Sequence, residues 1–189
     1  MNVIKNNKGF TILELLISTT VFSVILLLCT FGLVQVGRNY YRGATITRTQ
    51  NVARSVMSTL TQSIQFSGSD AVGTLPTAGT PLAPSGTFCI GSLRYVYKLD
   101  TKVGDTSADY ALKTSECING ASKQTELLGK GMSLRTFTIV KSGDYYTITL
   151  LIANADPDLL NADGSCKGGA GSQFCATSSL KTTVHRRLK

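Results

Sequence analysis

The sequence predicts an α+β protein in which a long N-terminal helix, membrane-spanning in its first half and amphipathic in its second, packs on a C-terminal head made of antiparallel β-sheet. Three observations carry this prediction. No Asp, Glu, Lys, Arg or His occurs from Leu15 to Gly37. Apolar residues then recur at helical spacing between positions 53 and 64. Further on, two alternating apolar segments flank the turn sequence KSGD.

The uncharged run from Leu15 to Gly37 is long enough to cross a membrane. It has 23 residues, mostly Leu, Ile, Val and Phe, and a helix rises about 1.5 Å per residue while a hydrocarbon core is about 30 Å thick. Glu14 stands just before this run. An ionised side chain at membrane depth costs about 2.5 kcal/mol or more. Either the run is not a membrane segment, or another group pairs with the Glu14 carboxylate.

The helix is expected to continue beyond the apolar run, through residues 38–66. Over this range a single stripe is apolar and the remaining positions are mostly polar, which is typical of a helix that packs on a core. The predicted stripe consists of Ala53, Met57, Leu60 and Ile64. If the helix is unbroken from Phe10 to Phe66, its 57 residues form a rod of about 86 Å.

Residues 67–189 are expected to form an extracytoplasmic β-rich head. The sequence SGSD ends the helix, and a loop with three of the four prolines follows it. A strand is predicted from Arg94 to Leu99, an antiparallel hairpin is predicted to turn near Gly143, and a last strand is expected within FCATSSLKTTVHRRL. A sheet with one apolar face needs a cover, which the helical stripe supplies.

Four of the five cysteines lie in the head, and an even number there indicates disulfides and an oxidising compartment. Four cysteines permit three pairings. Sequence proximity favours Cys89 with Cys117 and Cys166 with Cys175. Four free thiols are the alternative. A zinc site is disfavoured, because the chain has no CxxC motif and its one histidine is His185.

The net charge of +8 is compatible with an anionic partner such as nucleic acid. A simpler interpretation assigns the excess to two N-terminal lysines and to a solvated basic tail that contains Lys181, Arg186, Arg187 and Lys189. Enzyme motifs are missing from the sequence: it has no GxSxG, no Walker A loop and no HExxH. A hydrolytic triad would depend on His185, within that tail. We therefore expect a protein that is not an enzyme and holds no cofactor.

The segment KGFTILELLISTTVFSVILLL resembles the N-terminal signature of type IV pilins and pseudopilins. The signature has a short basic leader that ends in glycine, here Gly9, followed by Phe10. In this family the leader is cleaved off after the glycine. A glutamate, here Glu14, is the fifth residue after the cleavage site, and a long apolar helix follows. The resemblance covers about 30 residues. An ordinary secretory signal fits less well, since the apolar run is too long and no A-x-A site follows it.

The resemblance implies that a prepilin peptidase removes residues 1–9 on the cytoplasmic side and that the new Phe10 amine is methylated. Residues 10–37 then lie in the inner membrane, with the head outside. An inner-membrane assembly platform then helps to extract the subunit from the membrane. The subunit joins an extracellular or periplasmic filament of pilin or pseudopilin subunits. The Glu14 carboxylate pairs there with a Phe10 amine of its own or a neighbouring chain. Such pairing helps to select the register of packing.

Three questions about function stay open at the level of the sequence. The long helix and the sizeable head resemble the minor, J-type pseudopilins and minor pilins more than a compact major pilin. A competence-type pilin that binds DNA through its basic C-terminus is an alternative, and so is a membrane-anchored extracellular domain that never assembles. The machine itself could be a pilus, a secretion system or a DNA-uptake apparatus.

The segment NADPDLLNADGSC is rich in oxygen ligands. Calcium takes six to eight oxygens, and some major pseudopilins bind it in a C-terminal loop. The spacing here does not match an EF-hand, and Asn, Asp, Pro and Gly are also the residues that turns use. The predicted calcium ligands are Asp156, Asp158, Asn161 and Asp163.

Overall fold

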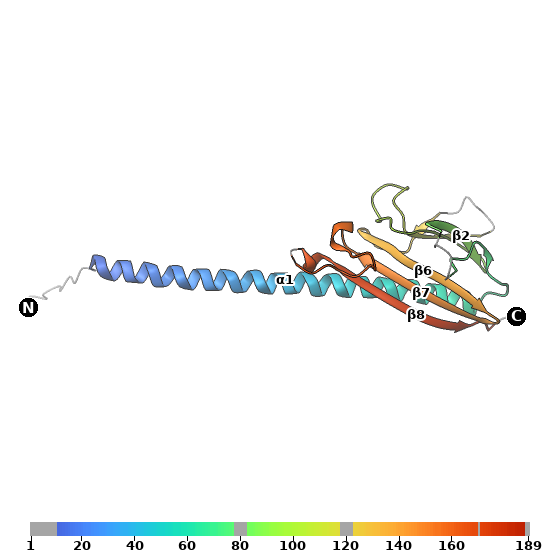
Figure 1. Cartoon of the computed structure of the whole chain (residues 1–189), viewed down its shortest axis with the longest axis horizontal. Coiled ribbons are helices and arrows are strands. Elements are labelled where there is room, and N and C mark those ends of the chain that lie inside the picture. The colour runs from blue at the N-terminus through green and yellow to red at the C-terminus, as the bar shows by residue number, and fades with distance from the viewer. Residues whose placement is uncertain (1–10, 78–82, 118–122, 170, 188–189) are drawn as a thin grey trace, which may run out of the picture. The chain divides into compact units, whose positions relative to one another are not determined.

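The computed structural model describes residues 11–77, 83–117, 123–169 and 171–187. The chain divides into two compact units, Met1–Tyr40 and Tyr41–Lys189, and each is described by itself. Helix α1, Ile12–Gln65, contributes to both units, and every strand belongs to the second (Figure 1). The predicted α+β layout is confirmed. The helix ends one residue before the predicted Phe66, and its predicted first residue, Phe10, lies outside the described residues.

Local hydrogen bonds explain how α1 begins and how it tolerates polar residues. The hydroxyl of Thr11 accepts a hydrogen bond from the backbone N–H of Glu14 at 3.2 Å, which satisfies one of the first N–H groups of the helix. Several hydroxyls bond to carbonyls of the preceding turn, so these polar groups are satisfied within the helix itself. In the apolar half they are Ser18, Thr19, Thr20 and Thr30.

In the described residues, the first unit contains the apolar half of α1. This half is long and apolar enough to cross a membrane, and its most apolar window has no buried residue. Large side chains such as Phe31 and Leu33 are 81% and 74% exposed. So much contiguous apolar surface is unfavourable in water. The unit therefore fits membrane anchoring.

The second unit contains two antiparallel sheets. The first sheet has the order β1-β2-β3-β4-β5, and the second has the order β6-β7-β8. Two short 3-10 helices, η1 and η2, lie between β7 and β8. The bounds are β1 Val72–Gly73, β2 Ser85–Ile90, β3 Leu93–Lys98, β4 Leu112–Glu116, β5 Thr125–Glu126, β6 Met132–Ser142, β7 Tyr145–Asn154, η1 Pro157–Leu159, η2 Ser172–Phe174 and β8 Ala176–His185.

The hairpin predicted around KSGD is confirmed. Strands β6 and β7 are joined by Gly143 and Asp144, and Gly143 has φ +62°, a conformation that favours glycine. The predicted apolar residues face one another across the two strands, and all are fully buried. The pairs are Leu134 with Ile152, Phe137 with Leu150, and Ile139 with Ile148. The last predicted strand is β8, which pairs with β7 along its whole length.

The strands of the head are antiparallel, as predicted, but they form two sheets rather than the one expected. Strand β3 covers the predicted segment, displaced by one residue, and pairs with the unpredicted β2 across a turn at Gly91. Isolated bridges, Leu99 with Leu134 and Lys102 with Ser133, link the two sheets. Strands β2 and β4 were missed because they lack a regular apolar alternation; β4 has one buried residue, Leu112.

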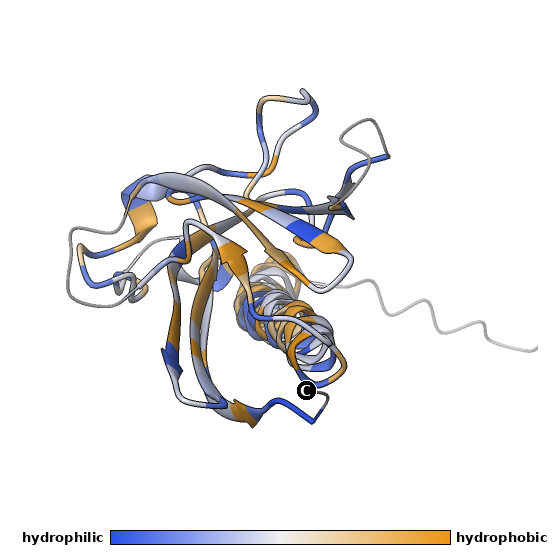
Figure 2. Ribbon diagram, turned by 90° about the vertical axis from the view of Figure 1, so that its right-hand side faces the viewer, coloured by the Kyte–Doolittle hydropathy of each residue, from blue (hydrophilic) through white to orange (hydrophobic). Residues whose placement is uncertain are grey.

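The helical stripe predicted from the sequence covers both sheets. Ala53, Met57, Leu60 and Ile64 are buried, and they belong to a core that also includes residues of β2, β3, β4, β6, β7 and β8. Strands β6, β7 and β8 run alongside the second half of α1 (Figure 1), and Figure 2 looks along this helix. Polar contact reinforces the packing: the hydroxyls of Ser63 and Tyr95 lie 2.6 Å apart, and burial raises the pKa of Tyr95.

Aromatic rings connect the two sheets. The ring of Phe137 in β6 lies 5.6 Å from that of Tyr97 in β3 and 6.0 Å from that of Phe88 in β2, between ring centroids. All three side chains are at most 1% exposed. Rings at such distances attract one another in addition to the area that they bury. Phe137 therefore holds the second sheet against the first.

The basic C-terminus is only in part the solvated tail that the charge pattern predicted: Lys181 and Arg187 are exposed, but Arg186 is not, and Lys189 lies outside the described residues. The side chain of Arg186 is only 14% exposed, and its guanidinium pairs with the carboxylates of Asp70 and Asp144. Asp70 also accepts hydrogen bonds from Lys141 at 2.7 Å and from the Tyr146 hydroxyl at 3.2 Å. The cluster ties the segment after α1 to strands β6 and β7 and to the chain after β8. The sequence does not indicate that Asp70 forms an ion-pair cluster, because its partners are distant along the chain.

The cluster predicts a pH dependence of stability. The hydrogen bond from Lys141, helped by the charge of Arg186, lowers the pKa of Asp70 below its ordinary value. A lowered pKa in the folded state means that the ionised carboxylate stabilises the fold above the unfolded pKa, near 3.9, and that this contribution is lost as the pH falls through the folded value. We expect Asp70→Asn to lower the melting temperature at neutral pH, and the difference from the wild type to vanish in strong acid.

The matched control is Asp105→Asn, which removes an ion pair with Lys130 whose two side chains are 79% and 67% exposed. Exposed pairs of this kind contribute little, so this variant should melt like the wild type at every pH. Melting is followed by circular dichroism of the full chain in detergent. Equal effects of the two substitutions would contradict the assignment of a special role to the Asp70 cluster.

Candidate functional site

The processing and assembly residues predicted from the signature lie at the start of the chain. Gly9 and Phe10 are outside the described residues. Glu14 lies in the first turn of α1, where a negative charge interacts favourably with the helix dipole. Its side chain is exposed, and its carboxylate makes no ion pair with any residue that the structure describes. A partner for this charge must come from the start of the chain or from another molecule.

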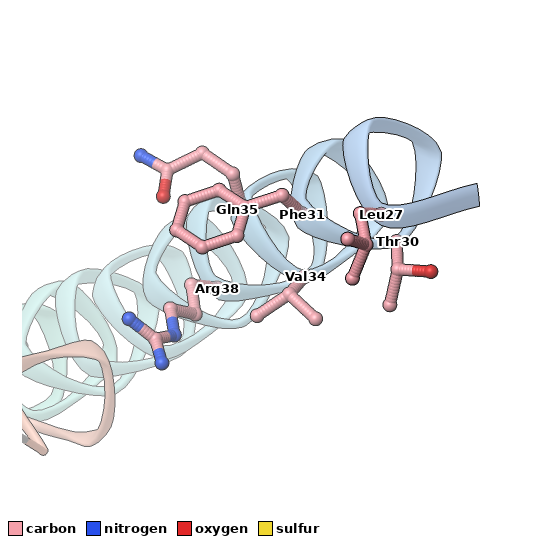
Figure 3. Close-up of a pocket in the computed structure, with 6 residues that line it drawn as sticks. All are labelled: Leu27, Thr30, Phe31, Val34, Gln35 and Arg38. Atoms are coloured by element: carbon pink, nitrogen blue, oxygen red, sulfur yellow. The ribbon is translucent and has the colours of Figure 1, made fainter. Parts of the chain in front are cut away.

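One face of the apolar half of α1 has a shallow hollow of about 220 Å³. Figure 3 shows the side chains that line it, all projecting from the helix: Leu27, Thr30, Phe31, Val34, Gln35 and Arg38. Their spacing of three and four residues places them on one side of the helix. A hollow formed by a single helix is too open to hold a small molecule, but it is the kind of groove into which side chains of another helix pack.

The head contains two disulfides, which join the pairs that sequence proximity favours. Cys89 bonds to Cys117 with their Cα atoms 6.0 Å apart, and Cys166 bonds to Cys175 with theirs 5.8 Å apart. The first disulfide connects β2 to the end of β4 in the same sheet, and the second closes the loop that contains η2. Cys29 in α1 is an exposed free thiol. The disulfides agree with a head that folds in an oxidising compartment.

Two of the four residues predicted as calcium ligands, Asn161 and Asp163, lie in a turn stabilised by its own hydrogen bonds. The Asp163 carboxylate accepts from the backbone N–H and the hydroxyl of Ser165, and these bonds lower its pKa. The Asn161 amide donates to the same hydroxyl at 2.9 Å. Asp156 forms an ion pair with Lys102 instead of pointing to this turn, and Asp158 lies in η1. Among the described residues, no group of three His, Cys, Asp or Glu side chains is arranged to hold a metal ion.

We predict that calcium does not stabilise this protein. The melting temperature should be the same in millimolar calcium and in chelator, because one carboxylate oxygen of Asp156 and one of Asp163 already have partners within the chain. The control is the variant in which Asp156, Asp158 and Asp163 are all replaced by alanine. A calcium-dependent rise in melting temperature that the wild type shows and this variant lacks would restore the calcium hypothesis.

His185, the one histidine, is the last residue of β8 and is exposed, as expected of a strand-end residue. Its ring packs edge-on against the ring of Tyr145, with 4.9 Å between centroids. This contact lies at the end of the sheet, where β7 begins.

An aromatic contact that the sequence does not predict lies where the second unit begins. The rings of Tyr41 and Phe174 are 6.4 Å apart between centroids, although the residues are far apart in sequence. The available signal was the Tyr40–Tyr41 pair directly after the apolar run, because tyrosine is enriched at membrane interfaces. Nothing in the sequence around Phe174 indicated that it would lie beside Tyr41.

Comparison with known families identifies the start of the chain. Residues 4–30 match the family model of the prokaryotic N-terminal methylation motif, which is the prepilin signature of type IV pilins and pseudopilins. The match includes Gly9, Phe10 and Glu14. Neither a curated protein nor a solved structure matches the chain. A family model thus matches the N-terminal signature, and the head is described from its structure alone.

Proposed function

We propose that this protein is a structural, non-enzymatic subunit of a type IV pilus or pseudopilus-like filament. The observation that carries the proposal is the prepilin signature at residues 4–30, joined to an apolar helix whose most apolar window has no buried residue. A helix exposed on all sides needs either lipid or other helices around it. In a subunit stored in the membrane, lipid surrounds this helix. Once the subunit is packed into a filament, helices of other subunits surround it.

Assembly exchanges one apolar environment for another. In the membrane, lipid surrounds the apolar half of α1; in a filament, the same half packs against the corresponding helices of its neighbours. Since lipid is as apolar as these side chains, the transfer gains little from the hydrophobic effect, and close packing and polar pairs must select the correct register. The hollow around Phe31 and Val34 offers a groove for such packing.

Glu14 supplies the polar pair in this proposal. After cleavage the Phe10 amine becomes the N-terminus, four residues before Glu14, which lies in the first turn of α1. The amine of the same chain or of a neighbour can therefore pair with the carboxylate. Within a bundle of apolar helices, an unpaired charge is strongly destabilising, so a subunit in the wrong register is disfavoured.

Mass spectrometry of the mature N-terminus tests processing. The proposal predicts cleavage between Gly9 and Phe10 by a prepilin peptidase and a methylated Phe10 amine. An inactive-peptidase strain should retain the leader and is the control. An intact Met1, or a cut beyond Thr30, would contradict the proposed maturation.

We place the subunit among the minor, J-type pseudopilins or minor pilins. A head with two sheets, two disulfides and an exposed disulfide loop favours this assignment over a compact major pilin. Quantitative mass spectrometry of purified filaments tests it, with the expectation that this chain is far less abundant than the principal subunit. Equal or greater abundance would make it a major subunit.

Fewer cations at the C-terminus are available to bind DNA than the charge pattern of the sequence suggests. Arg186 is paired with two carboxylates, so the basic end has one cation fewer for phosphate, while Lys181 and Arg187 are exposed. Binding through these residues would weaken steeply as salt rises. A gel-shift assay with the full chain in detergent at two salt concentrations separates this function from a purely structural one. Absence of binding at low salt removes the DNA-binding alternative.

A further inference from the structure

The disulfide loop places an exposed aromatic side chain at the start of the second unit. Phe174 lies in η2, inside the loop closed by Cys166 and Cys175. Its ring is in contact with that of Tyr41, and the two side chains are 56% and 59% exposed. Rings that prefer burial are thus held at the surface as a pair, and the disulfide restricts the loop that presents one of them.

Two cations belong to the same two segments as this aromatic pair: Arg42 follows Tyr41 in α1, and Lys167 lies with Phe174 in the disulfide loop. Arg42 and Lys167 line a hollow of about 370 Å³ together with residues of the disulfide loop, among them Gly168 and Ser172. The Lys167 ammonium donates to the backbone carbonyl of Asp158 at 3.0 Å. Neither cation forms an ion pair with a carboxylate in the segments that the structure describes. Both positive charges therefore remain available to an anionic group.

The distance along the chain sets how far Tyr41 lies from the end of the apolar run. The uncharged run ends at Gly37, and Tyr41 follows four residues later in the same helix, about 6 Å further on. Each headgroup layer of a bilayer is about 5–8 Å thick. When the apolar half of α1 spans the membrane, Tyr41 is therefore at headgroup depth. Tyrosine and basic side chains are favoured at that depth, and phenylalanine is favoured at the adjoining boundary with the acyl chains.

We propose that Tyr41, Phe174, Arg42 and Lys167 form a membrane-contact surface that rests on phospholipid headgroups while the subunit is stored in the bilayer. The rings lie at the boundary of the acyl chains, and the two cations bind lipid phosphates. This inference rests on the membrane stage of the proposed function. It gives the disulfide loop a role before assembly, because the loop sets the head on the bilayer and must be released when the subunit is extracted.

The chain contains no tryptophan, so a single introduced tryptophan reports on one position. Phe174→Trp probes the proposed surface. Phe66→Trp is the matched control, since Phe66 is 61% exposed and follows the end of α1, where Gln65 lies about 36 Å along the helix from Tyr41. Phe31→Trp reports on insertion of the apolar half. The full chain is reconstituted in phosphatidylethanolamine and phosphatidylglycerol vesicles that contain lipids brominated either near the headgroup or near the end of the acyl chain.

The expected result for Phe174→Trp is blue-shifted emission that shallow bromine quenches several-fold more strongly than deep bromine. The emission of Phe66→Trp should be quenched by neither. Adding Arg42→Gln and Lys167→Gln to Phe174→Trp should weaken the shallow quenching; unchanged quenching would overturn the role of the cations.

The Phe31→Trp variant separates failure of this inference from failure of the proposed function. If Phe174→Trp behaves like Phe66→Trp while deep bromine quenches Phe31→Trp, the membrane-contact surface is overturned and membrane anchoring stands. If neither bromine position quenches Phe31→Trp, the membrane stage of the proposed function fails as well.

Discussion

Replacing Glu14 with glutamine should reduce filament incorporation about 100-fold or more, while the protein still reaches the membrane. The substitution keeps the shape of the side chain and removes its charge, so the Phe10 ammonium is left without its partner in an apolar bundle. Removing one partner of a buried ion pair costs about 3–5 kcal/mol, and about 1.4 kcal/mol corresponds to a tenfold change. Filaments sheared from cells and the membrane fraction are both quantified by immunoblotting.

The matched control is Ser18→Ala, one turn further along the same helix. Among the residues that the structure describes, the Ser18 hydroxyl bonds within α1, to the carbonyl of Glu14 at 2.8 Å, so its loss should leave incorporation nearly unchanged. A membrane-anchored domain that never assembles would tolerate Glu14→Gln, since a neutral residue is cheaper in lipid. Wild-type incorporation of the Glu14→Gln variant would therefore contradict the filament proposal.

Replacing Phe137 with alanine should destabilise the head by about 4 kcal/mol, a loss typical of removing a fully buried aromatic side chain. Phe137 contacts Phe88 and Tyr97 of the other sheet, so the cavity opens at the junction of the two sheets. For a unit of this size the melting temperature should fall by about 10 °C. Thermal unfolding of the full chain in detergent, followed by circular dichroism, measures the change.

Phe174→Ala is the matched control for this prediction. It removes the same atoms from a side chain that is 56% exposed, and we expect a change in melting temperature several-fold smaller. Similar losses for the two variants would mean that Phe137 does not hold the sheets together. A large loss for Phe174→Ala alone would instead assign the structural role to the disulfide loop.

The elements with strong periodicity were predictable. The helical stripe that includes Leu60 and Ile64 repeats at helical spacing and is buried as expected. The β6–β7 hairpin combines long alternation with a glycine at a turn that requires positive φ, and it occurs at the predicted place. In both cases local pattern and tertiary packing agree, because one face of each element has to be apolar.

The polar elements were not predictable. Strand β4 is held by backbone pairing with β3 and by the Glu126 carboxylate, which accepts from the backbone N–H groups of Ala111 and Leu112. None of these contacts leaves an apolar repeat in the sequence. Arg186 was misread for a similar reason: a cation near a chain end is usually solvated, and only folding brings Asp70 and Asp144 to it.

Features that depend on neighbouring residues can be read directly from the amino-acid order: the prepilin signature at Gly9, Phe10 and Glu14, the length of the apolar run, and the periodicities of the helix and the hairpin. The tertiary structure alone decided what depends on residues far apart along the chain: the division into two sheets, the Asp70 cluster and the Tyr41–Phe174 pair. The physical reason is that periodicity records which face of an element is buried. The partner that buries it is chosen by packing and by electrostatic contacts that exist only in the folded chain.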